Sequence, residues 1–176
     1  MSNFLSTIKD FVVTLLIAVV IAVILKFFII DSCKILSGSM MPTLEKDDRV
    51  LVFKLAYKIS EPKRGDVIVF DPPAEIDEGV GFIKRVIGLP GDTVEIKNQA
   101  VYVNGKALSE DYLMEKSKDN FGPVTVPKGE YFVLGDNRNN SLDSHLWSYP
   151  FITLDDIESK AFFQYYPFSD IGLIKK

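Results

Sequence analysis

A continuous apolar stretch from Phe11 to Ile30 limits the folds available to this chain of 176 residues more than any other feature. A helix of this length, at about 1.5 Å rise per residue, reaches across the roughly 30 Å hydrocarbon core of a bilayer. Its only polar residues are Thr14, whose hydroxyl can bond back to the helix, and Lys26, which lies close enough to the end to reach the headgroups. The sequence therefore predicts a short N-terminal segment (residues 1–10), a membrane-spanning helix (11–30) and a second domain (31–176).

Two other interpretations of the apolar stretch stay open. A cleaved secretory signal is one, although the stretch exceeds the ~7–15 apolar residues of such signals and no A-x-A site follows it. A lipoprotein box ending at Cys33 is the other, although the charged Asp31 departs from that pattern. Charge does not orient the span, because lysine and aspartate residues lie on both sides of it. We expect an uncleaved anchor.

Composition excludes several kinds of site and partner. The single cysteine rules out an intrachain disulfide, and one cysteine with one histidine is a poor set of zinc ligands. A net charge of −4, without a basic stripe, argues against a nucleic-acid partner. Residues 31–176 suffice for one domain that buries its own core without metal or crosslinks. We therefore expect neither a metal nor a nucleic acid.

Short runs of alternating or β-branched residues between turn signals predict a mainly β domain of mostly antiparallel strands. The clearest unit is the hairpin Val94–Val103, followed by Asn104-Gly105, a dipeptide that favours tight turns. Leu108–Gly122 is predicted to be a surface loop, and Leu154–Lys160 a short helix with Thr153 as its N-cap. The predicted strands are Val50–Phe53, Val67–Phe70, Phe82–Ile87, Thr93–Ile96, Val101–Val103, Val124–Val126 and Tyr131–Leu134.

The segment Ser37–Leu44, with the sequence SGSMMPTL, places a candidate serine nucleophile just after the apolar stretch. Ser39 lies between Gly38 and Met40, and the following proline restricts the backbone. Taken alone, the segment is typical of a solvated turn. A serine hydroxyl is inert near neutral pH unless a base removes its proton, so the hypothesis requires a base elsewhere in the chain.

Lys84 is the candidate base. Alternation along its predicted strand puts Lys84 on the same face as Phe82 and Val86, opposite to Arg85. An ammonium group among apolar side chains loses its water, which lowers its pKa from ~10.4 towards the neutral range. The alternative is a strand lysine that reaches solvent.

A third polar segment, Gly135–His145, follows the predicted strand that ends at Leu134. Its many hydrogen-bonding side chains are, taken alone, typical of a turn-rich connection. A Ser-His-Asp triad of Ser39, His145 and Asp143 is an alternative to a lysine base. The two-residue spacing of Asp143 and His145 on one loop disfavours that triad.

Together these segments resemble the bacterial type I signal peptidases, which are membrane-anchored Ser-Lys endopeptidases. The resemblance covers almost the whole chain and follows the family's order of blocks. Its short length is similar to the compact Gram-positive type. The blocks that carry it are the N-terminal anchor, SGSMMPTL, RGDVIVF (Arg64–Phe70), FIKRVIGLPGD (Phe82–Asp92), GDNRNNSLDS (Gly135–Ser144) and the closing AFFQYYPFSDIGLI.

The resemblance implies a role for each matching residue and a strongly curved, mostly antiparallel β fold. Ser39 matches the nucleophile and Lys84 the general base. Ser37 matches the hydroxyl that joins the Ser39 backbone N–H in an oxyanion hole, and Ser141 the serine that hydrogen-bonds the base. Arg85 and Asp136 match a buried ion pair beside the dyad. The residues that match the walls of shallow apolar pockets are Ile35, Met40, Leu44, Phe82 and Ile83.

Three positions depart from the family's pattern. Leu36 stands where a proline is usual, Asn139 where an aspartate is, and His145 where an arginine is. The arginine is expected to pair with the residue that matches Asp143, and a mostly neutral imidazole would weaken that pair. We therefore expect altered loop order, substrate range or pH response.

The family's partners are the lipid bilayer and secretory preproteins whose signal peptides end in small residues, typically Ala-x-Ala. Its mechanism needs no cofactor. Its topology puts the N-terminus in the cytoplasm and the catalytic domain outside. Two alternatives stay open: a signal peptidase-like assembly factor of the pilus type without turnover, and a Ser-Lys protease that cleaves itself. The second predicts an N-terminal DNA-binding domain, whereas this chain begins with an apolar span.

Overall fold

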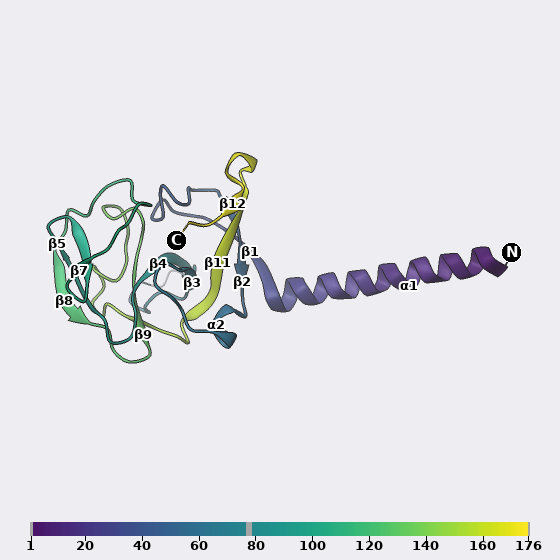
Figure 1. The fold of residues 1–176 in the computed structure, drawn as a ribbon, viewed down its shortest axis with the longest axis horizontal. Helices are drawn as coiled ribbons and strands as arrows, with labels where there is room; N and C mark the ends of the chain where they lie inside the picture. Colours follow the sequence, from purple (N-terminus) through teal and green to yellow (C-terminus); the bar gives the residue numbers. More distant parts are fainter. Residues whose placement is uncertain (1, 77–78, 176) are drawn as a thin grey trace.

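The computed structural model describes residues 2–76 and 79–175 and shows a long helix that projects from a β domain (Figure 1). The helix α1 (Ser2–Ile24) continues through a π-helical turn, η1 (Leu25–Ile29), directly into strand β1 (Ile30–Lys34). The predicted span thus contains Ile30, which is the first residue of a strand. Within the described residues, no helix is both long enough and apolar enough to cross a membrane.

The larger of two sheets contains eight strands among the described residues, and neighbouring strands are antiparallel. The order is β1-β2-β11-β3-β4-β9-β10, and β12 pairs with β11. Two short helices, α2 (Ala56–Ile59) and η2 (Phe168–Asp170), lie in its connections. The strands after β1 are β2 (Arg49–Phe53), β3 (Val67–Phe70), β4 (Phe82–Gly88), β9 (Glu130–Leu134), β10 (Ile152–Thr153), β11 (Ile157–Tyr166) and β12 (Gly172–Leu173).

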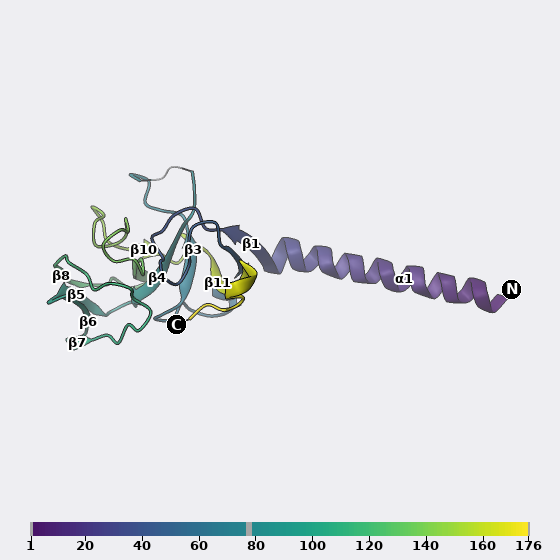
Figure 2. The same ribbon diagram turned by 90° about the horizontal axis from the view of Figure 1, so that it is seen from above.

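The smaller sheet lies at the end of the domain opposite to α1 in both ribbon views (Figures 1 and 2). Its order is β7-β6-β5-β8. Two-residue turns join β5 to β6 at Asn98-Gln99 and β6 to β7 at Asn104-Gly105, with positive φ at all four residues. These turns confirm the predicted hairpin. The strands are β5 (Thr93–Lys97), β6 (Ala100–Val103), β7 (Lys106–Ala107) and β8 (Phe121–Thr125).

The prediction of a helix at Leu154–Lys160 is wrong. Ile157–Tyr166 forms β11, which pairs with β2 on one side and β3 on the other. Ile157, Ser159 and Ala161 are buried in alternation, as expected of a strand. Thr153 caps a turn instead of a helix, since its amide and hydroxyl both donate to Asp156 Oδ2 at 2.7 Å.

The other predicted strands are present, with one shift. The strand expected at Val124–Val126 occupies Phe121–Thr125. The loop predicted at Leu108–Gly122 therefore ends at Asn120. Four short strands, β1, β7, β10 and β12, were not predicted. Each is a strand because it pairs with another segment, and its own short sequence carries no strand pattern.

The core nearest to α1 lies against the first strands of the larger sheet. It packs the segment after β1 onto β2, β3 and β4. Its position matters because the same segment carries Ser39. The buried members of this cluster are Ile35, Met40, Leu44, Val50, Val52, Val67, Val69, Ile83 and Ala161.

Candidate active site

A groove of about 910 Å³ runs between the segment Cys33–Ser39 and the start of β4. Each wall presents the free edge of a strand to the groove. β1 pairs with β2 on its side away from the groove. The start of β4 pairs with β3 on one side, but β9 joins its other side only from Arg85 onwards. An extended peptide could therefore add to these edges as a strand. Ser39 and Lys84 line the groove, and so do the free thiol of Cys33 and the exposed side chain of Leu36.

Ser39 and Lys84 meet at the wall of this groove. Lys84 Nζ donates a hydrogen bond to Ser39 Oγ at 2.8 Å, and both residues are buried. Lys84 lies in β4 and pairs with Ile68 of β3, one residue before β4 begins to pair with β9 at Arg85. The ammonium lies 5.1 Å from the centre of the Phe82 ring, in agreement with the predicted shared face.

Burial lowers the pKa of Lys84 from 10.5 to about 8, because the ammonium is removed from water. The negative charges of Asp143 and Asp136 oppose this effect without cancelling it. With this pKa, about a tenth of the lysine is neutral at pH 7. Lys84 can therefore act as a base under ordinary conditions.

Ser37 lies on the same side of the groove. Its Oγ is 3.2 Å from Ser39 Oγ, and either hydroxyl can donate. The Ser37 side chain is exposed towards the groove, so its proton can turn to another acceptor there. The pair therefore places a second hydroxyl donor next to the candidate nucleophile.

The loop Gly135–His145, which we call the catalytic loop, holds the backbone of Ser39. The Asn137 amide donates to Ser39 O, and Asn137 Nδ2 donates to Gly38 O, both at 3.0 Å. Gly135 allows this close approach: a Cβ there would lie 2.5 Å from Ser39 O and 2.6 Å from Ser141 Cβ. A side chain at position 135 would push the two segments apart.

The predicted hydrogen bond between Ser141 and Lys84 is not formed. Ser141 is buried, and its Oγ has no hydrogen-bond partner in the described part of the chain. Its Cβ packs over Gly135, so the residue does lie beside the segment that carries Ser39. The structure assigns Ser141 a packing contact, and its role towards the base stays a prediction.

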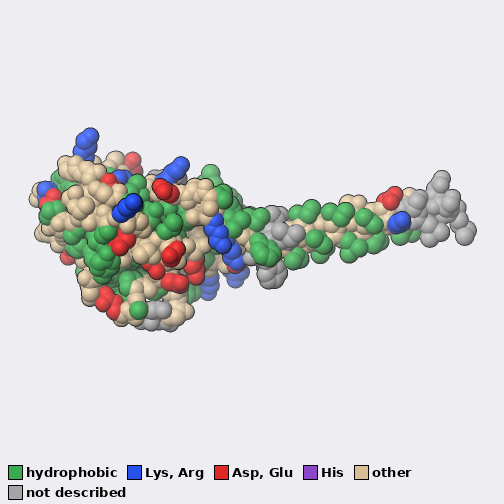
Figure 3. Space-filling view, turned by 90° about the horizontal axis from the view of Figure 1, so that it is seen from below, with side chains coloured by type: hydrophobic (Ala, Val, Ile, Leu, Met, Phe, Trp, Pro, Cys, Tyr) green, Lys and Arg blue, Asp and Glu red, His purple; other side chains and the backbone are tan. Residues whose placement is uncertain are grey.

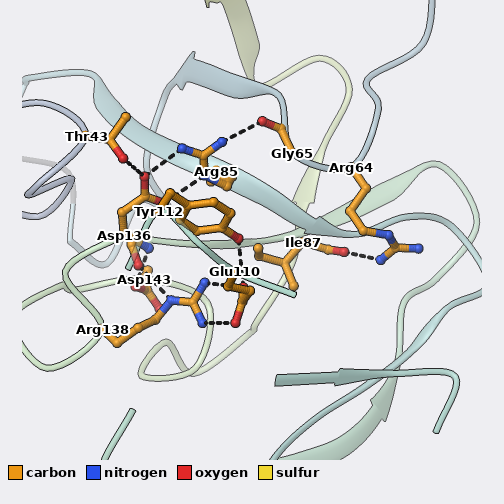
Figure 4. Close-up of polar contacts among 11 residues, drawn as sticks. Thr43, Arg64, Gly65, Arg85, Ile87, Glu110, Tyr112, Asp136, Arg138 and Asp143 are labelled. Atoms are coloured by element: carbon orange, nitrogen blue, oxygen red, sulfur yellow. Dashed lines mark hydrogen bonds and ion pairs between the residues drawn. The ribbon is translucent and has the colours of Figure 1, made fainter. Parts of the chain in front are cut away.

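Arg85 and Asp136 form the predicted ion pair beside the dyad (Figure 4). Arg85 Nε and Nη2 donate to the two Asp136 carboxylate oxygens at 2.8 and 2.7 Å, and both side chains are fully buried. Thr43 Oγ1 donates to Asp136 Oδ2 at 2.5 Å. Arg85 Nη1 donates to the carbonyl oxygens of Gly65 and Lys175. The pair therefore joins β4 to the catalytic loop.

His145 replaces the expected arginine without losing the pair with Asp143. His145 Nδ1 lies 2.6 Å from Asp143 Oδ1, and Nε2 lies 3.3 Å from Asp119 Oδ2. Burial alone would lower the pKa of His145, but the hydrogen bonds and charges of Asp143 and Asp119 outweigh it and raise the pKa. The pair that we expected to be weakened is therefore formed, and the raised pKa favours the charged form of the imidazole.

The alternative Ser-His-Asp triad is not formed. His145 is engaged by two carboxylates, and Ser39 Oγ contacts Lys84 and Ser37. Asp143 Oδ2 instead accepts from the Gly135 amide at 2.8 Å, which fixes the start of the catalytic loop. Asp143 and His145 thus order this loop.

The five predicted pocket residues divide into two groups. Ile35, Phe82 and Ile83 line the groove. Met40 and Leu44 do not: both are fully buried in the core beneath it, because the turn after Ser39 directs them inwards. Those two residues support the wall from behind.

Sequence reasoning missed several residues that hold the site. Asn137 was visible only as part of a polar loop. Glu110 and Arg138 gave no local signal because they pair with each other across 28 positions, and Tyr112 gave none because it stacks on the distant Arg85. Among the described residues, no group of three or more His, Cys, Asp or Glu side chains is arranged to hold a metal ion.

Comparison with known proteins identifies the family. The model of "Signal peptidase, peptidase S26" matches residues 8–166. The chain belongs to this signal peptidase family. It is 45% identical over 170 residues to "Probable signal peptidase I-1" of Synechocystis sp., covering 94% of this chain and 86% of that protein. It is 37% identical over 180 residues to "Signal peptidase I" of Bacillus licheniformis, covering 97% and 95%.

A solved structure agrees with this assignment. The crystal structure of a signal peptidase I from Enterococcus faecalis V583 matches with a TM-score of 0.50 and 37% sequence identity, covering 57% of this chain and 97% of that one. The recognised fold is therefore that of a signal peptidase. The activity is that of signal peptidase I, a serine endopeptidase that removes signal peptides from preproteins.

Proposed function

We propose that this signal peptidase uses Ser39 as nucleophile and Lys84 as general base, and that it cleaves membrane-associated preproteins after small residues. The observation that carries the proposal is the 2.8 Å contact between Lys84 Nζ and Ser39 Oγ at the wall of the groove. The lowered pKa of Lys84 supports it, because only a neutral amine accepts the serine proton.

In the proposed reaction, neutral Lys84 takes the proton of Ser39 as Oγ attacks the scissile carbonyl. The oxyanion accepts hydrogen bonds from the Ser37 hydroxyl and the Ser39 amide. Lys84 then protonates the leaving amine, and the acyl-enzyme forms. Water, deprotonated by the same lysine, hydrolyses this ester and frees Ser39.

The groove fits a substrate in an extended conformation. Backbone pairing with the edges of β1 and β4 supplies affinity that does not depend on side chains. Ile35 and Ile83 give the groove apolar walls that suit short side chains. Each such contact discriminates weakly, so we infer that anchoring in the substrate's own membrane supplies much of the selectivity.

The N-terminal helix is proposed to be the anchor, with the N-terminus in the cytoplasm and the catalytic domain outside. Between Phe11 and Val23, every side chain of α1 except Thr14 is apolar and exposed, and Figure 3 shows these apolar side chains along one face of the helix. A helix that is apolar all round and not covered by protein suits lipid. The helical part of the predicted span, residues 11–29, supplies about the length that a bilayer requires.

The topology is testable with single cysteines in a Cys33→Ser background. In intact cells, a thiol reagent that does not cross membranes is expected to label a cysteine at exposed Lys128 and to label one at Lys9 only after permeabilisation. Labelling of both positions in intact cells would contradict a single span with a cytoplasmic N-terminus. Labelling of the cysteine at position 9 alone would show the opposite orientation, with the N-terminus outside the cell.

The lysine base predicts the pH dependence of cleavage. Since protonated Lys84 cannot accept the serine proton, kcat is expected to rise roughly fiftyfold from about pH 6 to about pH 8. It should level off above the pKa of about 8. The measurement is preprotein cleavage at saturating substrate, with circular dichroism at each pH as the control for folding. A folded enzyme whose kcat is unchanged over this range would exclude Lys84 as the base.

A further inference from the structure

The loop between β7 and β8, Leu108–Asn120, follows the outer side of the catalytic loop and contacts it at three places. Glu110 binds Arg138, the stretch from Glu115 to Lys118 binds Asn139, and Asp119 binds His145. Nothing in the proposed chemistry requires these contacts, since no residue of Leu108–Asn120 lines the groove.

The contact at Arg138 is buried and bidentate. Arg138 Nη2 and Nη1 donate to the Glu110 oxygens at 2.6 and 3.0 Å, and the two side chains are 2% and 7% exposed. Arg138 Nε donates to Gly135 O at 3.0 Å, and Tyr112 Oη donates to Glu110 at 2.7 Å. A buried ion pair adds little net stability, but it does specify one geometry. Here the Arg138–Glu110 pair fixes Gly135, the residue that lies against the backbone of Ser39.

Tyr112 links the Glu110–Arg138 pair to β4, because it contacts both Glu110 and Arg85. The Arg85 guanidinium stacks over the Tyr112 ring at 4.0 Å while it holds Asp136 (Figure 4). Figure 4 shows the ring lying between the Arg85 pair and the Arg138–Glu110 pair. Since Arg85 is adjacent to Lys84 in β4, the loop touches both the base's strand and the segment that holds Ser39.

Asn139 is matched to this loop in a way that an aspartate is not. Its Nδ2 donates to Glu115 Oε2 at 3.0 Å and to Lys116 O at 3.1 Å, and its Oδ1 accepts from the Lys118 amide at 3.0 Å. An aspartate has no amide hydrogens to donate and would place a second carboxylate against Glu115. The asparagine at this position therefore has a physical reason in the sequence of Leu108–Asn120.

We propose that Leu108–Asn120 is a clamp loop that positions the catalytic loop, and that Glu110 and Asn139 are positioning residues for cleavage. The proposal rests on the Ser39–Lys84 dyad described above. The clamp loop acts through the catalytic loop, whose Asn137 binds the backbone of Ser39. If the clamp loop releases it, Ser39 moves away from Lys84 and water reaches the ammonium. The base then holds its proton more strongly, so activity requires a higher pH.

The test is a double-mutant cycle in the full-length enzyme with an Ala-x-Ala preprotein. Asn139→Asp is expected to lower kcat about tenfold with KM changed less than about twofold, and to move the rise of kcat to higher pH. Glu115→Gln alone should stay within about threefold of the wild type. The double variant should regain most of the loss, because the glutamine amide can donate to the carboxylate introduced at position 139.

Asn98→Asp, which adds the same charge to an exposed turn of the smaller sheet, is the matched control and should leave the pH profile unchanged. Glu110→Gln tests the buried contact independently and should shift the profile in the same direction. The clamp is refuted if folded Asn139→Asp and Glu110→Gln enzymes keep the wild-type kcat and pH profile, or if Glu115→Gln fails to rescue Asn139→Asp. Full activity of Ser39→Ala would refute the dyad instead, so the two failures are distinguishable.

Discussion

Lys84→Met is expected to reduce preprotein cleavage by at least about 10³-fold while leaving the fold as stable as before or more stable. The chemical loss follows because no other base contacts Ser39 Oγ among the described residues; its partners are Lys84 and Ser37. The gain in stability follows because a pKa of about 8 in the folded state, against 10.5 unfolded, means that folding disfavours the bound proton. The unfolded lysine holds more protons than the folded one between about pH 10 and pH 8, so the penalty builds up as the pH falls through this range. It is fully present below pH 8 and amounts to roughly 3 kcal/mol.

The measurements are kcat/KM on an Ala-x-Ala preprotein and the free energy of unfolding by denaturant at pH 7. Ser39→Ala should lose as much activity as Lys84→Met, and the double variant should lose no more than either, since the two residues act as one unit. Lys106→Met, which removes an exposed lysine from β7, is the matched control and should retain activity. A Lys84→Met enzyme that folds and still cleaves would refute the proposal that Ser39 and Lys84 act as a catalytic dyad.

Much of the fold could be predicted from the sequence because several strands carry their own pattern. Val67–Phe70 is apolar throughout and is buried at every position, and the hairpin turns follow from Asn98-Gln99 and Asn104-Gly105. β11 could not be predicted, because its first residues also fit a capped helix and only its pairing with β2 and β3 decides between them. Here tertiary pairing overrides local propensity.

The residues of the candidate site likewise divide into those that could be predicted from the sequence and those that could not. Ser39, Lys84, Arg85 and Asp136 could be predicted because each stands in a block that resembles the family, and the structure brings each pair together. The inward direction of Met40 depends on a turn whose geometry the sequence does not reveal. The clamp loop was predicted only as a surface loop, because an ion pair between residues 28 positions apart leaves no local pattern.

Breaking the Arg85–Asp136 pair should have the second largest effect. Asp136→Asn keeps the size of the side chain but leaves the Arg85 charge fully buried without its counter-ion, and we expect the free energy of unfolding to fall by about 3–5 kcal/mol. Cleavage should fall as well, since the pair joins the strand of Lys84 to the loop that holds Ser39.

The double variant Arg85→Met/Asp136→Leu separates these two consequences. Removing both charges removes the uncompensated one, so much of the lost stability should return. Activity should not return, because the ion pair that ties the catalytic loop to β4 is then gone and the Arg85 stack on Tyr112 is lost too. Glu95→Gln, which breaks a partly exposed pair with Lys97, is the control and should change stability by less than about 1 kcal/mol. Recovery of both stability and cleavage in the double variant would mean that the pair serves packing alone.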